Sequence, residues 1–177
     1  LYKLRLSGQE ILGYLEYSYG LWCGPDANTG EHLLYLKDQA DEQHFPTVNP
    51  TFNFSAAAGI DYTVDLRKAQ GERISIKQLS DGRTFSPDSV YTVAVNSYRA
   101  IGGGGHLTQG AGLSPEELRQ RIVWVSPHDL RYHLIEWAKV HQPLTPPRYN
   151  NWAFIPKEQA APAIARDRRI IEGSLNK

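Results

Sequence analysis

The sequence predicts an α+β fold, with helices packed on a sheet, for a single globular domain that spans residues 1–177. Two observations lead to this prediction. Several short stretches alternate between apolar and polar residues, as half-buried strands do. A serine followed three residues later by an acidic residue, which is a helix-start signal, recurs three times along the chain. With 41% hydrophobic residues, the chain has enough apolar side chains for a core.

Charge and cysteine content exclude several classes of protein. Nineteen basic residues balance nineteen acidic ones, so we expect no nucleic-acid partner and no attraction to an anionic membrane. No apolar run reaches the roughly 18 residues of a membrane span. The single Cys23 is expected to be a small apolar side chain or a surface thiol. Because the sequence begins inside a strand pattern without a Met, we expect an N-terminally truncated piece of a longer protein.

The first elements are a strand and a helix. Residues 2–6 alternate as a strand, and Ser7 and Glu10 have the spacing of a capping box, so a helix is expected to begin there. Apolar and aromatic residues recur at helical spacing from Ile11, and Gly20 is expected to end this helix after about three turns. We expect its aromatic stripe to face the core.

The next elements are strands of the same sheet, at residues 60–66, 73–79 and 90–95, with a weaker strand at 32–36. Asp81-Gly82 is a two-residue turn signal. His32 and His44 have no partners at ligand spacing and are expected on the surface. Phe52 and Phe54, in the loop before residue 60, are either core plugs or an exposed aromatic platform, and the pattern alone favours plugs.

The most unusual stretch follows the strand 90–95, where four glycines run into a histidine: Gly102, Gly103, Gly104, Gly105 and His106. Consecutive glycines are kept where the backbone needs φ > 0 or where a ligand approaches the main chain closely. A sharp turn without a ligand is an equally good interpretation of the spacing. The stretch is neither a dinucleotide fingerprint nor a P-loop, because it lacks the G-x-G-x-x-G spacing and a following Lys with Ser or Thr.

The remaining elements are mostly helical. Ser114 with Glu117 predicts one helix start, and Ser126 with Asp129 predicts another, whose apolar face is expected to pack on the sheet until Pro143. That face consists of Leu130, Leu134, Trp137, Ala138 and His141. His128 and His133 are five residues apart, so we do not expect them to share a helix face as in a two-histidine zinc site.

The C-terminal end predicts a short strand at residues 152–155 and a helix from Pro156, broken or started at Pro162. The arginines near its end, Arg166, Arg168 and Arg169, are most simply a solvated face.

Four stretches taken together resemble the C-terminal domain of the 5′-nucleotidase family, which includes UDP-sugar hydrolases and 2′,3′-cyclic-nucleotide 2′-phosphodiesterases. They are Tyr2-Lys-Leu-Arg-Leu-Ser-Gly-Gln, Ala58-Gly-Ile-Asp-Tyr-Thr-Val-Asp, Gly71-Glu-Arg-Ile and Tyr91-Thr-Val-Ala-Val-Asn-Ser-Tyr-Arg-Ala-Ile-Gly-Gly-Gly-Gly. The resemblance covers residues 2–106, and the part from about 114 is similar to an extension of bacterial members. It implies a mixed sheet, export to the periplasm or cell surface, and binding of the nucleoside part of a nucleotide.

The resemblance also implies a site. In the family two aromatic rings sandwich the base; Phe54 matches the first ring, and His106 stands where the second is usually Phe. The implied substrate-binding residues are therefore Phe54, His106 and the glycines Gly102, Gly103, Gly104 and Gly105. A histidine at the second position would make binding depend on pH.

Family members are expected to place their chemistry in a separate N-terminal metallophosphatase domain with two divalent metal ions. This chain has none of the Asp-x-His, Gly-Asn-His-Asp/Glu or Gly-His-x-His runs that would hold those ions. We therefore expect no catalytic residue, metal or cofactor in this chain, and no phosphatase activity from it alone. The alternative function is a non-catalytic binding or interaction module that reuses the fold.

Overall fold

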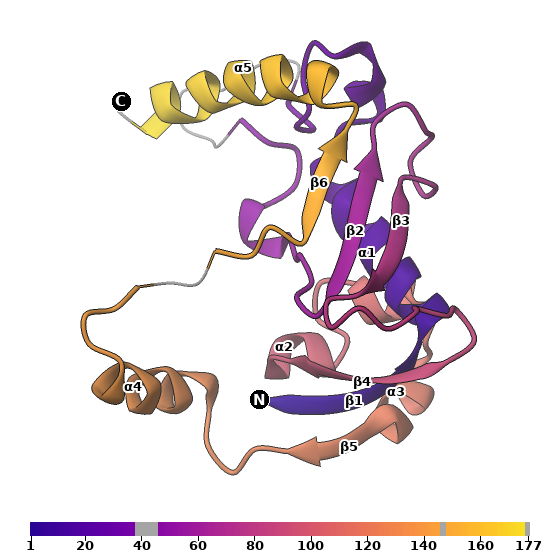
Figure 1. Cartoon of the computed structure of the whole chain (residues 1–177), viewed down its shortest axis with the longest axis vertical. Coiled ribbons are helices and arrows are strands. Elements are labelled where there is room, and N and C mark those ends of the chain that lie inside the picture. Colours follow the sequence, from indigo (N-terminus) through magenta and orange to yellow (C-terminus); the bar gives the residue numbers. More distant parts are fainter. Residues whose placement is uncertain (38–45, 146–147, 176–177) are drawn as a thin grey trace. The chain divides into compact units, whose positions relative to one another are not determined.

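The computed structural model describes residues 1–37, 46–145 and 148–175, and its elements divide into two compact units (Figure 1). The first unit contains residues 1–14 and 86–150, and the second contains 15–85 and 151–177. Both units combine helices with a sheet, which confirms the predicted α+β class. That the chain acts as a single domain stays a prediction. No helix among the described residues is long and apolar enough to cross a membrane.

The first unit is built on an antiparallel sheet in which β1 (Tyr2–Ser7) is central (Figure 1). It pairs with β4 (Val90–Val95) on one side and with β5 (Ile122–Val125) on the other. Because strand side chains alternate between faces, Leu4 and Leu6 share the core face, and each is at most 1% exposed. The core around them consists of Ala100, Leu107, Leu113 and Leu118.

α1 (Gly8–Trp22) follows β1 directly. The Ser7 Oγ accepts the Glu10 N–H at 3.1 Å, and the Ser7 N–H donates to the Glu10 carboxylate at 2.7 Å, which confirms the predicted capping box. The helix ends at Trp22 rather than at Gly20. A glycine ends a helix when it takes the left-handed conformation, and Gly20 is not among the glycines with positive φ.

The other helices of the first unit are α2 (Ser97–Ala100), the π-helical turn η3 (His106–Gly110), α3 (Pro115–Arg121) and α4 (Leu130–Val140). Ser114 and Glu117 form the predicted capping box at the start of α3. The predicted start of the next helix at Ser126 is wrong. Asp129 is the N-cap of α4 and accepts the Tyr132 N–H at 2.8 Å, whereas the Ser126 Oγ hydrogen-bonds His133 Nε2 at 2.6 Å.

The predicted packing of the α4 apolar face on the sheet is also wrong. Leu134 is 57% exposed and Trp137 is 42% exposed, and within the described chain no residue of α4 is buried. The helical period identifies an apolar face but does not say which surface covers it.

The second unit is built on a mixed sheet in the order β3-β2-β6. β2 (Ile60–Asp65) pairs antiparallel with β3 (Ile74–Leu79) and parallel with β6 (Trp152–Ile155). The prediction of one sheet that contains residues 2–6, 60–66, 73–79 and 90–95 is therefore wrong, because these strands divide between two sheets. Alternation fixes which face of a strand is buried, but it does not fix the neighbouring strand.

The core of the second unit contains a cluster of aromatic rings beside its aliphatic residues. The Tyr19 and Tyr62 hydroxyls hydrogen-bond at 2.9 Å, and both rings meet Trp152. Cys23 is fully buried, and burial raises the pKa of its thiol to about 12, so it serves as a small apolar side chain. The unit also holds the 3₁₀ turns η1 (Pro25–Thr29) and η2 (Thr51–Asn53). In place of the predicted strand at 32–36 there are two isolated bridges, Cys23 to Leu34 and Leu36 to Thr47.

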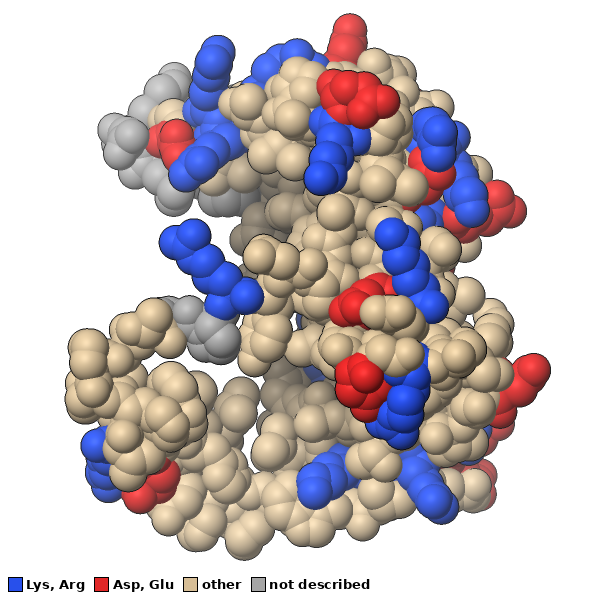
Figure 2. Space-filling view, in the orientation of Figure 1, with Lys and Arg blue, Asp and Glu red and all other residues tan. Residues whose placement is uncertain are grey.

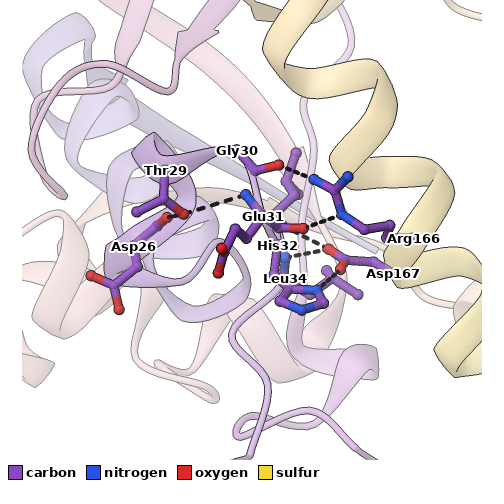
Figure 3. Close-up of polar contacts among 9 residues, drawn as sticks. Asp26, Thr29, Gly30, Glu31, His32, Leu34, Arg166 and Asp167 are labelled. Carbon is purple, nitrogen blue, oxygen red and sulfur yellow. Dashed lines mark hydrogen bonds and ion pairs between the residues drawn. The ribbon is translucent and has the colours of Figure 1, made fainter.

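α5 (Lys157–Leu175) is tied to the segment after η1 by a buried carboxylate (Figure 3). Asp167, which is 2% exposed, accepts the N–H groups of Leu33 and Leu34 at 2.7 Å each and pairs with His32 Nδ1 at 2.6 Å. Arg168 and Arg169 are exposed, and so is the neighbouring Arg166, which confirms the predicted solvated face. The Arg166 guanidinium donates to the carbonyl oxygens of Glu31, at 2.6 Å, and of Gly30.

Two more predictions concern single residues. His32 lies at the surface as expected, with 44% of its side chain exposed, and His44 lies outside the described residues. Pro162 falls inside α5, which begins just after Pro156.

Candidate functional site

The glycine run follows a single helical turn at the end of β4. The Asn96 side chain caps α2 by accepting the Arg99 N–H at 2.8 Å. The chain then reverses through three glycines in the left-handed region: Gly102 at φ 91°, Gly104 at 75° and Gly105 at 79°. A residue with a Cβ is strained there, so these three positions need glycine for the backbone alone.

Gly103 needs to be glycine for a different reason. A Cβ on it would lie 2.5 Å from the carbonyl oxygen of Tyr98 and 2.5 Å from Cε2 of the Tyr98 ring. The loop is held in this contact by Arg99, which is 6% exposed and donates Nη1–H to the Gly103 carbonyl at 3.1 Å. The main chain of the loop therefore packs against the Tyr98 ring. Tyr98 itself is 53% exposed.

His106 ends the loop as a buried anchor. No part of the residue is exposed, its Nδ1 lies 2.9 Å from the Gly104 carbonyl oxygen, and its ring centroid lies 4.8 Å from that of Tyr14. The next residue, Leu107, belongs to the core of the first unit. A base can stack on His106 only if the imidazole leaves its buried position or the groups that cover it move.

Phe54 lies in the second unit, at the C-cap of η2. Its half-buried ring meets Tyr19 edge-on, with centroids 5.1 Å apart, and lies 4.5 Å from the Trp22 ring. Ser18 fixes the following backbone, because its Oγ bonds both the N–H and the carbonyl of Ser55 at 2.7 Å. Phe52, by contrast, is 83% exposed. Of the two phenylalanines, Phe54 is partly a core residue and Phe52 is a surface residue.

The structure thus brings the four glycines and His106 together within one unit. Phe54 belongs to the other unit, and the Phe54–His106 sandwich stays a prediction. Among the described residues there is no group of three or more His, Cys, Asp or Glu side chains that could hold a metal ion.

Sequence reasoning missed two features around these residues. Tyr98 was not singled out, because nothing in the pattern places a ring five residues earlier against Gly103. The rings of His128 and His133 were not expected together, yet they lie 6.3 Å apart, edge to face. His128 precedes α4 rather than lying on it, so the helical spacing rule does not apply to this pair.

The sequence matches known proteins over much of its length. The model of the family "5′-nucleotidase, C-terminal domain" matches residues 1–110. The chain is 28% identical over 167 residues to the trifunctional nucleotide phosphoesterase protein YfkN of Bacillus subtilis. This match covers 86% of this chain and 10% of that protein. It is 27% identical to the 2′,3′-cyclic-nucleotide 2′-phosphodiesterase/3′-nucleotidase of Salmonella typhimurium over 88% of this chain and 24% of that protein.

One solved structure has a similar fold. It is a crystal structure assigned to a 5′-nucleotidase from Staphylococcus aureus, in complex with α-ketoglutarate. The TM-score is 0.59 at 19% identity, and the match covers 86% of this chain and 26% of that one. The chain therefore spans about a quarter or less of the length of the proteins it matches. Since the family model covers more than half of the sequence, the chain belongs to the family of 5′-nucleotidase C-terminal domains.

Proposed function

We propose that this chain is the nucleoside- or nucleotide-recognition domain of a metal-dependent nucleotide phosphohydrolase that acts in nucleotide catabolism. The observation that carries the proposal is the family match over residues 1–110, because that stretch contains both Phe54 and the glycine loop. The two similar curated proteins are named for nucleotide phosphoesters, which agrees with it. In this proposal the two divalent ions and the hydrolysis belong to an N-terminal metallophosphatase domain of a longer polypeptide, located in the periplasm or at the cell surface.

Phe54 is the stacking ring in this proposal. Stacking of a base on an aromatic side chain contributes about 1–3 kcal/mol and is tolerant of base identity, because every base has a π-face. Contacts with Tyr19 and Trp22 already hold the Phe54 ring, so little side-chain entropy is lost when a base binds. In this proposal the second ring is His106 at the end of the glycine loop, which must leave its buried position to meet a base.

The test measures nucleoside affinity in the full-length polypeptide by calorimetry. Phe54→Ala and His106→Ala are each expected to weaken binding roughly 5- to 150-fold, which corresponds to the stacking energy. Phe52→Ala is the matched control, because Phe52 is two residues away and 83% exposed, and it should leave affinity unchanged.

Thermal melting must first establish that each variant is folded. Parental affinity in folded Phe54→Ala and His106→Ala variants would contradict the sandwich. If only Phe54→Ala lost affinity, His106 would not be a stacking ring, and its role would be to anchor the loop through its contact with Tyr14.

A further inference from the structure

The C-terminal helix α5 lies outside residues 1–110, the stretch that the family model matches, yet it contacts residues that lead to Phe54. Its buried face carries Ala160, Ala163 and Asp167 at helical spacing, each at most 3% exposed. In Figure 2 basic and acidic side chains are interspersed on the surface over this helix, as on an ordinary solvated face. The two alanines bury little apolar area, so polar contacts take a large part in fixing the position of α5.

Three polar side chains of α5, those of Gln159, Arg166 and Asp167, hold the main chain of η1 and of the residues after it. Gln159 and Arg166 donate to carbonyl oxygens of this segment. Asp167 accepts the N–H groups of Leu33 and Leu34 on a single carboxylate oxygen, Oδ2, at 2.7 Å each (Figure 3). The Asp167 bonds are buried, whereas those of Arg166 are exposed, so Asp167 makes the stronger of these connections.

The segment held by α5 pairs with the end of α1, which carries Trp22. The Gly24 N–H donates to the Leu33 carbonyl at 2.9 Å, and the Tyr35 N–H donates to the Trp22 carbonyl at 2.8 Å. The ring centroids of Trp22 and Phe54 are 4.5 Å apart. The helix α5 therefore fixes a stretch whose hydrogen-bond partner supplies a neighbour of the Phe54 ring.

The same stretch also pairs with the chain that leads into Phe54. The Val48 N–H donates to the Tyr35 carbonyl at 2.8 Å, and the Asn49 side chain donates to the Leu21 carbonyl at 2.8 Å. η2 follows shortly after, and Phe54 is its C-cap. Hydrogen bonds thus connect α5, through this stretch, to the turn that carries the Phe54 ring.

We propose that Asp167 is a positioning residue for the Phe54 ring, and that α5 thereby sets how tightly the site holds a nucleobase. This inference rests on the proposed function, in which Phe54 is the stacking ring. Asp167 acts on the ring through the main chain that it holds and does not contact the base. A ring that loses this support must be ordered again whenever a base binds, and that ordering reduces affinity.

The test is a double-mutant cycle in the full-length polypeptide, with adenosine and uridine as the probes in calorimetry. Asp167→Ala should weaken their binding roughly 2- to 30-fold, the range expected when a substitution acts on a site from a distance. Asp167→Asn keeps an oxygen that can accept both N–H groups, so its affinity should lie between those of Asp167→Ala and the parent. When Phe54→Ala is already present, Asp167→Ala should weaken binding no further, because the ring that it positions is gone.

His32→Ala is the matched control, because it removes the side-chain partner of Asp167 but leaves both main-chain bonds. It should leave affinity unchanged. Hydrogen exchange tests the same connection without a ligand. In peptides from residues 46–54, the amides of Asp167→Ala should exchange at least about tenfold faster than those of the parent, and those of His32→Ala should not.

Parental affinity in folded Asp167→Ala would overturn the proposal, as would unchanged exchange at residues 46–54. An equal loss of affinity with and without the Phe54 ring would also overturn it, because Asp167 would then be a general stabiliser. If Asp167→Ala does not fold, Asp167→Asn takes its place in the cycle and in the exchange measurement. Parental affinity in Phe54→Ala would instead contradict the proposed function, and hydrogen exchange would then decide alone whether Asp167 holds the turn that carries Phe54.

Discussion

Removal of the buried carboxylate that ties α5 to the segment after η1 should destabilise the second unit strongly. The Asp167 side chain is 3% exposed and accepts two main-chain N–H groups, from Leu33 and Leu34, at 2.7 Å each. Both of these residues are buried, so water has little access to either N–H once the carboxylate is gone. A hydrogen bond to a charged group is worth about 1.5–3 kcal/mol, so Asp167→Ala should cost about 3–6 kcal/mol.

Part of that cost is offset, because burial of the Asp167 carboxylate itself costs desolvation free energy, and the alanine variant no longer has this cost. We therefore expect about 3–4 kcal/mol, which lowers the melting temperature of a chain of this length by roughly 6–16 °C. Urea denaturation monitored by tryptophan fluorescence measures the free energy of unfolding directly.

His32→Ala is the matched control for Asp167→Ala. It removes the third partner of the carboxylate but leaves both main-chain bonds, and the His32 side chain is already 44% exposed. We expect it to cost less than about 1 kcal/mol. Asp167→Asn keeps one acceptor oxygen and should fall between the two. Equal, small losses for Asp167→Ala and His32→Ala would show that the main-chain bonds do not hold α5, and the reasoning would be refuted.

Two further predictions concern the glycine loop and acid stability. Gly103→Ala should destabilise the protein by about 1–3 kcal/mol, because its Cβ meets the Tyr98 carbonyl, whereas Gly173→Ala, in α5 with nothing within 4 Å, should stabilise it by about 0.5–1 kcal/mol. Melting of both variants tests this, and shifts of the same sign would contradict it. Arg67 hydrogen-bonds Asp65 and lowers the pKa of that carboxyl from 3.8 to about 2. The ion pair should stabilise the folded protein by at most about 1 kcal/mol, fully above pH 4 and progressively less as the pH falls toward 2. If Asp65→Asn lost the same amount of stability as the parent over this pH range, the prediction would be contradicted.

Features that depend on residues close together in the chain could be predicted from the sequence. The capping boxes at Ser7 and Ser114 each need only a partner three residues later, and both formed as predicted. The start of α4 was misplaced because Ser126 and Asp129 are both good N-cap residues. The structure uses the later one and leaves the Ser126 hydroxyl bonded to His133.

Features that depend on distant partners could not be predicted in the same way. The strands at 60–66 and 90–95 have similar alternation, yet β2 pairs with β6 from the far end of the chain, while β4 pairs with β1. β5 was missed altogether, because its four apolar residues follow α3 directly and show no alternation. Asp167 was not singled out, since its partners lie more than 130 residues away. Only the folded chain brings such groups together.

The glycine loop shows how far the candidate site itself can be argued from the sequence. Four consecutive glycines suggested that a ligand approaches the main chain. In the structure each has an internal reason: Gly102, Gly104 and Gly105 lie in the left-handed region, and Gly103 is pressed on Tyr98. Loss of binding in a glycine variant would therefore show that the loop had changed shape, and it would not show that the ligand contacts that glycine.

Phe54 is the more decisive position for the same reason. Its ring is half-buried among Tyr19 and Trp22, and truncation removes an aromatic surface at a position where the backbone needs no special conformation. Truncation of Phe52 removes the same kind of ring from the same loop, where it is 83% exposed. When both alanine variants melt like the parent, a difference in their nucleoside affinity therefore reports the Phe54 ring, since loop composition, charge and lost side-chain volume are matched.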